Sequence, residues 1–422
     1  MSTLTGMVFL LLAAFAVYFI LKRPSCTRPA ILWVALGLKM AAAIALGLVY
    51  TYYYPVGDTF GFFEDARQLN AMFYQDATSY LSFLWSGDDT FPVFAQLTNI
   101  QTRSLFMVKV VSMINLLSME NYWITACYFA LISFLGALYL VIKVSVYFPK
   151  QVPAALIGFL LVPSVLFWGS GIVKETLALA SLAFIAGFFL VVIFRSRPKA
   201  WEWCGLALAA FFLWNLKYYW AVMFFVPAIS TWVVYRLADA RVFSAPSVVA
   251  WLMIFLVLAL GASFIHPNFY LTRLLQVISE NHQAFVATHT TGPFVHFFDL
   301  APSWQSMLAN SPWALISGLY RPFLGETPTI FHGLMALENF LLCGLTLYNL
   351  PHLAPALRSP YRIIIISTMS YIVLLVIFLT LSTPNLGTLS RYRIGCVPFL
   401  FFLLLCKFPF AKLKARLKLN LT

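Results

Sequence analysis

Residues 176–195 read TLALASLAFIAGFFLVVIFR, an apolar run whose only charged residue, Arg195, is its last. A helix of about 20 apolar residues is long enough to cross the ~30 Å hydrocarbon core of a bilayer. Directly after the run comes the basic segment Arg195–Lys199, and positive charge of this kind is typical of cytoplasmic loops. The stretch therefore predicts a transmembrane helix that ends on the cytoplasmic side.

The composition of the whole chain extends this prediction. Of its 422 residues, 62% are hydrophobic and 10% are charged, and the mean hydropathy is +0.87. A soluble domain is about 45–50% apolar and about 25% charged, so a soluble protein is excluded. The predicted fold class is all-α, a polytopic transmembrane helix bundle of about eleven spans. The spans are expected at 4–22, 30–54, 121–143, 152–171, 176–195, 203–216, 219–235, 246–265, 330–350, 361–382 and 393–408.

The net charge of +13 has a topological explanation. Most of the 27 basic residues lie in short segments next to predicted spans. Alternating the spans puts these segments on one side, as the positive-inside rule requires, with the N-terminus outside and the C-terminus cytoplasmic. The charge therefore indicates a lipid bilayer and not nucleic acid as the partner. The segments are Lys22–Arg28, Lys143–Lys150, Arg195–Lys199, Arg236–Arg241, Arg358–Arg362 and Lys407–Lys418.

We expect a single integral membrane domain, 1–422, with two large extracytoplasmic loops, 55–120 and 266–330. Long structured loops on one side of a bundle usually carry function. Apolar residues at i, i+3 and i+4 spacing predict an interfacial helix at Leu105–Met119 in the first loop. Further helices are expected in the second loop at 269–285 and 303–320.

Acidic residues are few, and the first loop opens with a group of them. Asp58 follows the end of a predicted span, between Gly57 and Gly61, which would let a ligand approach the backbone. A carboxylate there can serve as a general base, and it can equally cap the helix that follows. Glu64 and Asp65 fit solvated acids of a first helical turn, although a second carboxylate could help to bind a metal ion or an acceptor.

Cationic residues form three further candidate groups. Lys174 and Glu175 follow the turn Gly169-Ser-Gly171 between two spans, where Lys174 could meet a phosphate and Glu175 could orient it, or both could be solvated. Arg391 and Arg393 precede the last span at its outer end. They could bind a phosphate in bidentate fashion or reach lipid headgroups. Arg321 and Glu326 offer one more pair.

The arrangement resembles the GT-C superfamily of polytopic glycosyltransferases. The resemblance rests on Gly57-Asp58 in the first large outer loop, on the helix at Leu105–Met119, and on Arg391-Tyr-Arg393 before a late span. In addition, the segment from Pro163 through Trp168 to Lys174-Glu175 looks like one that recurs in bacterial membrane proteins of surface-polysaccharide assembly.

The resemblance implies transfer of a sugar from a polyprenyl-phosphate-linked donor to a lipid-linked glycan or protein acceptor, at the outer face of a bacterial inner membrane. Asp58 would be the catalytic base, with Glu64 and Asp65 as the neighbouring acids. The donor phosphate would be held by Lys174, Arg391, Arg393 and Arg321, supported by Glu175 and Glu326. No cofactor is implied, and a divalent cation and protein partners stay open.

Two other classes of function compete with this interpretation. A polymerase or ligase of surface polysaccharide would depend on the arginines more than on Asp58. A non-enzymatic subunit or flippase of an envelope-assembly complex would be expected to carry mid-bilayer charges and inverted repeats. Lys39 and Glu338 are the only charges that we place well inside spans, and no repeat is visible in the sequence.

Overall fold

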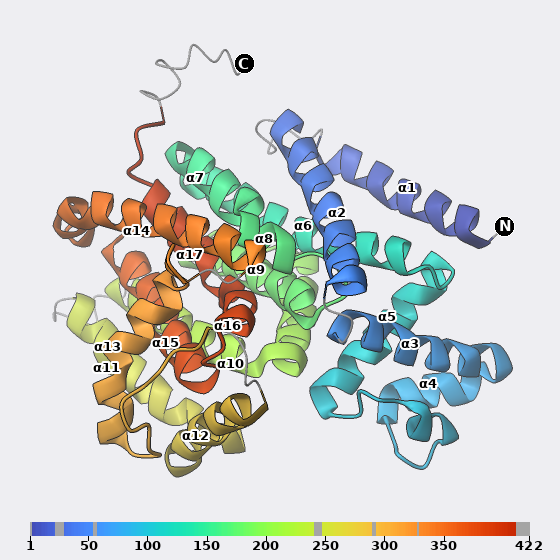
Figure 1. Cartoon of the computed structure of the whole chain (residues 1–422). Helices are drawn as coiled ribbons and strands as arrows, with labels where there is room; N and C mark the ends of the chain where they lie inside the picture. The colour runs from blue at the N-terminus through green and yellow to red at the C-terminus, as the bar shows by residue number, and fades with distance from the viewer. Residues whose placement is uncertain are drawn as a thin grey trace. The chain divides into compact units, whose positions relative to one another are not determined.

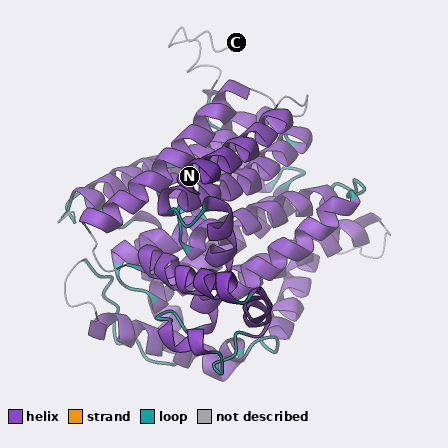
Figure 2. Cartoon of the chain, turned by 90° about the vertical axis from the view of Figure 1, so that its right-hand side faces the viewer, coloured by secondary structure: helices purple, strands orange, loops and turns teal. Residues whose placement is uncertain are grey.

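The structure is a computed structural model that describes residues 2–21, 29–53, 57–239, 247–288, 293–326 and 329–410. Within these ranges the helices are joined by loops and turns, and the chain forms no strand apart from one isolated bridge between Phe294 and Asn385 (Figure 2). The all-α fold class is therefore confirmed. The predicted basic segment Lys22–Arg28, residues 55–56 of the first loop and most of the basic C-terminal tail lie outside the described residues.

Several helices are long and apolar enough to cross a membrane, so the chain is a multi-pass membrane protein. Among the described residues six helices meet this test, and a helix pair bent by 65° at Leu386–Gly395 and Val397–Leu405 would make a seventh span. The six are α2 (Pro29–Tyr52), α6 (Tyr122–Tyr147), α9 (Lys174–Ile193), α10 (Ala200–Asp239, apolar to Leu237), α14 (Ile330–Leu357) and α15 (Arg362–Ser382) (Figure 1).

Other predicted spans take a different form. The span expected at 152–171 is divided into α7 (Val152–Leu156), a π turn (Ile157–Leu161) and α8 (Pro163–Trp168). Val162 is extended before Pro163, the conformation that a following proline favours, and this breaks the helix. The two short spans expected at 203–216 and 219–235 form α10, with a non-helical residue at Lys217. The spans expected at 4–22 and 246–265 are the shorter apolar helices α1 (Ser2–Leu21) and α11 (Ser247–Ala262).

The chain divides into two compact units. Unit 1 comprises 1–146, 165–188 and 199–218, and unit 2 comprises 147–164, 189–198 and 219–422. In unit 1 the predicted first loop folds into α3 (Asp58–Gln75), α4 (Ala77–Ser86), a 3-10 turn (Pro92–Gln96) and α5 (Thr102–Ser118).

The helix α5 corresponds to the interfacial helix expected at Leu105–Met119, but it lies inside unit 1. Its residues Met107, Val108 and Val111 are fully buried, and the helix packs along α3. A buried polar seam joins the two helices, since Ser112 donates a hydrogen bond of 2.7 Å to Asn70.

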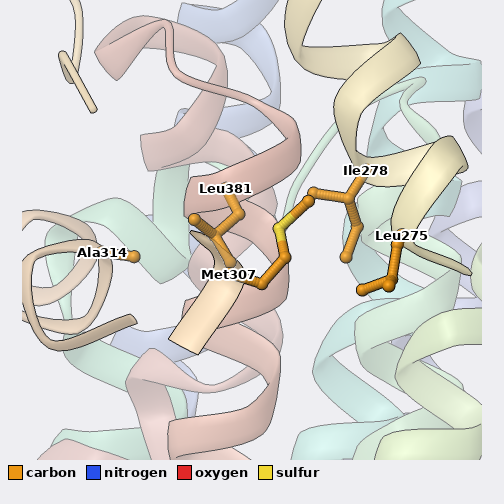
Figure 3. Close-up of a cluster of buried hydrophobic side chains, with 5 residues drawn as sticks. All are labelled: Leu275, Ile278, Met307, Ala314 and Leu381. Carbon is orange, nitrogen blue, oxygen red and sulfur yellow. The ribbon is translucent and has the colours of Figure 1, made fainter. Parts of the chain in front are cut away.

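Unit 2 contains the second predicted loop. Its helices α12 (Leu271–Thr288) and α13 (Trp304–Tyr320) match the stretches expected at 269–285 and 303–320. They close on α15 around a buried apolar cluster (Figure 3). After α15 come α16 (Leu386–Tyr392), a 3-10 turn (Arg393–Gly395) and α17 (Val397–Leu405). The cluster consists of Leu275, Ile278, Met307, Ala314 and Leu381.

Candidate functional site

Asp58 is the first residue of α3, and its side chain is exposed. The residue that precedes the helix is Gly57, which offers no side-chain cap, so Asp58 lies one position inside the N-cap. A carboxylate in the first turn is still favoured by the helix dipole. The space at Gly57 is filled by the ring of Tyr50, because a β-carbon there would lie 2.2 Å from it. The glycine thus serves packing within unit 1.

The two neighbouring acids of α3 have different environments. Glu64 is exposed and pairs with Arg67 at 3.2 Å. Asp65 is 3% exposed and accepts hydrogen bonds from the backbone and side chains of Thr98 and Asn99, at 2.8–3.2 Å. Asp65 therefore anchors the chain segment that leads into α5.

Lys174 begins α9 and reaches across unit 1 to the first loop. Its ammonium donates a hydrogen bond of 2.8 Å to the hydroxyl of Ser104, at the start of α5. It also lies 5.2 Å from the centre of the Phe62 ring in α3. The charges that act on this ammonium are those of Lys217, Asp58, Glu175 and Arg103. We call Asp58, Arg103, Lys174, Glu175 and Lys217 the charge cluster of unit 1.

Within the charge cluster, Glu175 and Lys217 form a buried ion pair. Their carboxylate oxygen and ammonium nitrogen are 2.7 Å apart, and the side chains are 0% and 5% exposed. Lys217 is the residue at which α10 departs from helical geometry. Since these two charges neutralise each other, the carboxylate of Asp58 is outweighed by the cations of Lys174 and Arg103.

A second buried cation supports the turn that precedes Lys174. Lys39 in α2 is 1% exposed and donates hydrogen bonds of 2.8 Å to Ser133 in α6 and 2.7 Å to the carbonyl oxygen of Gly169. Gly169 opens the Gly-Ser-Gly turn that leads to α9. The hydrogen bond from Lys39 therefore fixes the position of the turn, and with it the position of Lys174 at the start of α9.

Helix N-termini add to the positive potential at the cluster. Asp58, Arg103 and Lys174 stand in the first turns of α3, α5 and α9, where backbone N–H groups lack helical partners and the helix dipole is positive. The N-cap residues Gly57 and Gln101 supply no side-chain hydrogen bond to α3 and α5. Cations and helix N-termini together favour an anion, and phosphate is a common one at such positions.

The expected site residues Arg391, Arg393 and Arg321 belong to unit 2. Arg393 is 2% exposed, and its guanidinium donates to the carbonyl oxygens of Gly318 and Leu319 at 3.0 and 3.1 Å and to the side chain of Asn339. It thereby caps the C-terminus of α13, where carbonyl groups lack helical partners. Arg391 is 9% exposed in the last turn of α16.

Arg321 and Glu326, the other expected pair of unit 2, interact directly. The guanidinium of Arg321 donates to both carboxylate oxygens of Glu326 at 2.7–3.1 Å, and it lies 5.8 Å from the centre of the Trp313 ring. The backbone N–H of Phe323 also donates to Glu326. These hydrogen bonds hold the pKa of Glu326 below its ordinary value. The pair closes the turn between α13 and α14.

A divalent cation is not supported by these residues. In the part of the chain that the structure describes, no group of three His, Cys, Asp or Glu residues comes together to hold a metal ion. Asp65 uses its carboxylate for Thr98 and Asn99, and Glu64 pairs with Arg67. The two acids next to Asp58 thus have partners of their own within unit 1.

The structure places Asp58, Lys174 and Glu175 in unit 1 and adds residues that sequence reasoning missed. Of these residues, Arg103 gave a weak sign in the sequence, since a basic residue in a predicted outer loop departs from the positive-inside trend. Ser104 is its neighbour. Lys217 interrupts two apolar runs, but nothing in the sequence pairs it with Glu175. Compared with known proteins, the chain matches no protein-family model, no curated protein and no solved structure.

Proposed function

We propose that the protein is a glycosyltransferase of a bacterial inner membrane. It would transfer a sugar from a polyprenyl-phosphate-linked donor to a lipid-linked glycan or protein acceptor on the extracytoplasmic face. The observation that carries the proposal is the position of Lys174, whose ammonium donates a hydrogen bond to Ser104 at the start of α5 and lies over the ring of Phe62 in α3, the helix that begins with Asp58. Such a site combines a proton acceptor with an anion-binding surface.

The residues of the cluster suit the two halves of a direct displacement. Asp58 takes the proton from the acceptor hydroxyl, whose oxygen forms the new bond to the anomeric carbon of the sugar. The bond from that carbon to the phosphate oxygen breaks, and its electron pair stays with the polyprenyl phosphate. Lys174 and Arg103 stabilise the negative charge that develops on the departing phosphate. The ion pair of Glu175 and Lys217 holds Lys174 in place.

The first experiment replaces Asp58 and measures turnover of a polyprenyl-phosphate-linked sugar in membranes. Asp58→Asn keeps the shape but removes the proton acceptor, so we expect a loss of about 10²–10⁴-fold in rate with normal expression. Glu64→Gln, an exposed acid on the same helix, is the matched control and should keep its activity. Full activity of Asp58→Asn would reject Asp58 as the base.

The second experiment tests whether the cations of the charge cluster bind the donor phosphate. Arg103→Gln removes one cation of the cluster, and a lost hydrogen bond to a charged group costs about 1.5–3 kcal/mol, or roughly 10–150-fold in kcat/KM. Arg67→Gln, on an exposed arginine of α3, should have little effect. Equal effects of the two substitutions would show that Arg103 contributes only general surface charge.

The buried ammonium of Lys39 favours a second candidate function. Charges inside membrane-crossing helices often mark a transport pathway, so a lipid or glycan flippase could use the same anion-binding cluster without chemistry. The flippase predicts that Asp58→Asn leaves translocation of a labelled lipid-linked glycan intact in vesicles. The transferase predicts loss of transfer with glycan binding retained.

A further inference from the structure

The helix α4 presents an outward face that carries no charge. The residues of this face are spaced at i, i+3, i+4 and i+7, and two of them are strongly exposed apolar side chains, Leu81 at 62% and Trp85 at 93%. The opposite face packs inside unit 1 through Tyr80 and Phe83, which are 2% and 0% exposed. The outward face consists of Thr78, Leu81, Ser82 and Trp85.

The chemistry of this face fits the headgroup layer of a bilayer. Tryptophan is enriched at membrane–water interfaces, where its ring is in contact with lipid and its N–H stays hydrated. Serine and threonine hydroxyls on the same face suit a shallow position. Asp76 and Asp88, near the two ends of α4, accept hydrogen bonds from backbone N–H groups. Asp76 accepts from Thr78 and Ser79, and Asp88 accepts from Thr90.

Within unit 1, α4 is connected through α3 to the membrane-crossing helix α2. The helix α2 ends in the exposed aromatic residues Tyr52 and Tyr53, 82% and 46% exposed, which are typical of an interfacial belt. α3 packs against the end of α2, and α4 packs against α3 (Figure 1). Tyr74, 63% exposed at the end of α3, extends the aromatic surface toward α4.

We propose that α4 lies in the headgroup layer of the bilayer, with Leu81 and Trp85 inserted among the lipids. This assigns to α4 the interfacial position that the sequence indicated for α5, which packs along α3 and α1 and buries Met107, Val108 and Val111. The proposal does not depend on the reaction that the protein catalyses. Its consequence is that α3, with Asp58 in its first turn, is held next to the bilayer surface, with its polar face toward water.

The test uses the full chain in phosphatidylcholine vesicles whose acyl chains carry bromine near the headgroup or near the chain end. Bromine quenches tryptophan by contact, and Trp85→Phe isolates the share of Trp85 in the total emission. We expect Trp85→Phe to lose a quenchable component that responds more to the shallow bromine than to the deep one. As Trp85 is exposed, its replacement should leave the fold intact.

A photo-crosslinking amino acid at position 81 provides the second measurement, with position 68 as the matched control. Gln68 is exposed on the polar face of α3. We expect lipid adducts at 81 and none at 68. Quenching of Trp85 by aqueous acrylamide but not by bromolipid would place the face in water and overturn the proposal. Protection from both, with protein adducts at 81, would overturn it in favour of a partner protein.

Discussion

Substitution of two adjacent carboxylates of α3 is expected to change the stability of the protein by very different amounts. Asp65 is buried and accepts hydrogen bonds from Thr98 and Asn99, so Asp65→Ala removes hydrogen bonds to a charged group and should cost about 1.5–3 kcal/mol. Glu64 is exposed, so Glu64→Ala should change stability by less than about 0.5 kcal/mol. Thermal unfolding in detergent measures both. Similar effects of the two would contradict the anchoring role of Asp65.

The pair of Arg321 and Glu326 predicts a dependence of stability on pH. Hydrogen bonds from Arg321 lower the pKa of Glu326 below its ordinary value of 4.5. The stabilisation is therefore present above that value and is lost as the pH falls through the lower pKa of the folded state. Wild type should be more stable than Glu326→Gln at pH 7, and the difference should vanish in acid. A difference that is independent of pH would exclude this linkage.

At the level of single residues, sequence reasoning selected charged side chains but could not assign their partners. Arg391 and Arg393 had equal claims to a phosphate, yet Arg393 is taken up by carbonyl groups of α13, 74 and 75 residues away along the chain. Asp58 and Lys174 were selected separately, and only folding brings their charges together. Long-range partners of this kind leave no local pattern.

At the level of elements, the ion pair of Glu175 and Lys217 joins the start of α9 to the bend in α10. Removing one partner of a buried pair leaves an uncompensated charge, so Lys217→Met should cost about 3–5 kcal/mol. Adding Glu175→Leu removes that charge, and the double variant should recover most of the loss. Thermal unfolding of wild type, the single variants Lys217→Met and Glu175→Leu, and the double variant forms the cycle. Additive losses would mean that the two side chains do not interact.

The contact between α6 and α9 rests on a close approach of their backbones. A β-carbon at Gly136 would lie 2.4 Å from the carbonyl oxygen of Ala180, so Gly136→Ala should force the helices apart and cost about 1–3 kcal/mol. Gly37 in α2 has nothing within 4 Å, and Gly37→Ala should stabilise by about 0.5–1 kcal/mol through helix propensity. Equal shifts in melting temperature would contradict this packing.

Hydropathy predicted where membrane-crossing helices lie but not where they break. The windows at 30–54, 121–143, 176–195 and 361–382 match α2, α6, α9 and α15 within four residues, and the window at 330–350 starts with α14, which runs on to Leu357. The window at 152–171 is as apolar as these but is divided around Pro163, and the last window is bent by 65°. The average hydropathy of a window indicates whether that segment lies in lipid or in water. Where a helix is interrupted depends instead on the backbone geometry at a few positions.

At the level of the whole molecule, the distribution of basic residues predicts the sidedness of the loops. A reporter placed at Asp89, in the first loop, should be extracytoplasmic, and one at Lys199, between α9 and α10, should be cytoplasmic. Alkaline phosphatase and a fluorescent protein fused at each position give complementary readouts. A cytoplasmic signal at Asp89 would move the charge cluster to the other side of the membrane and reject the proposed donor.

The hydrogen bonds of Lys39 also bear on the insertion of α2, because their acceptors are synthesised much later than the lysine. Its hydrogen-bond partners Ser133 and Gly169 lie 94 and 130 residues further along the chain. At about 5–20 residues per second, the ribosome finishes them roughly 5–25 s after α2 has emerged. A charged lysine at the centre of an isolated helix costs about 2.5–3.5 kcal/mol on insertion. Until α6 and the start of α9 arrive to receive its ammonium, this cost has to be offset by the apolar residues of α2 itself.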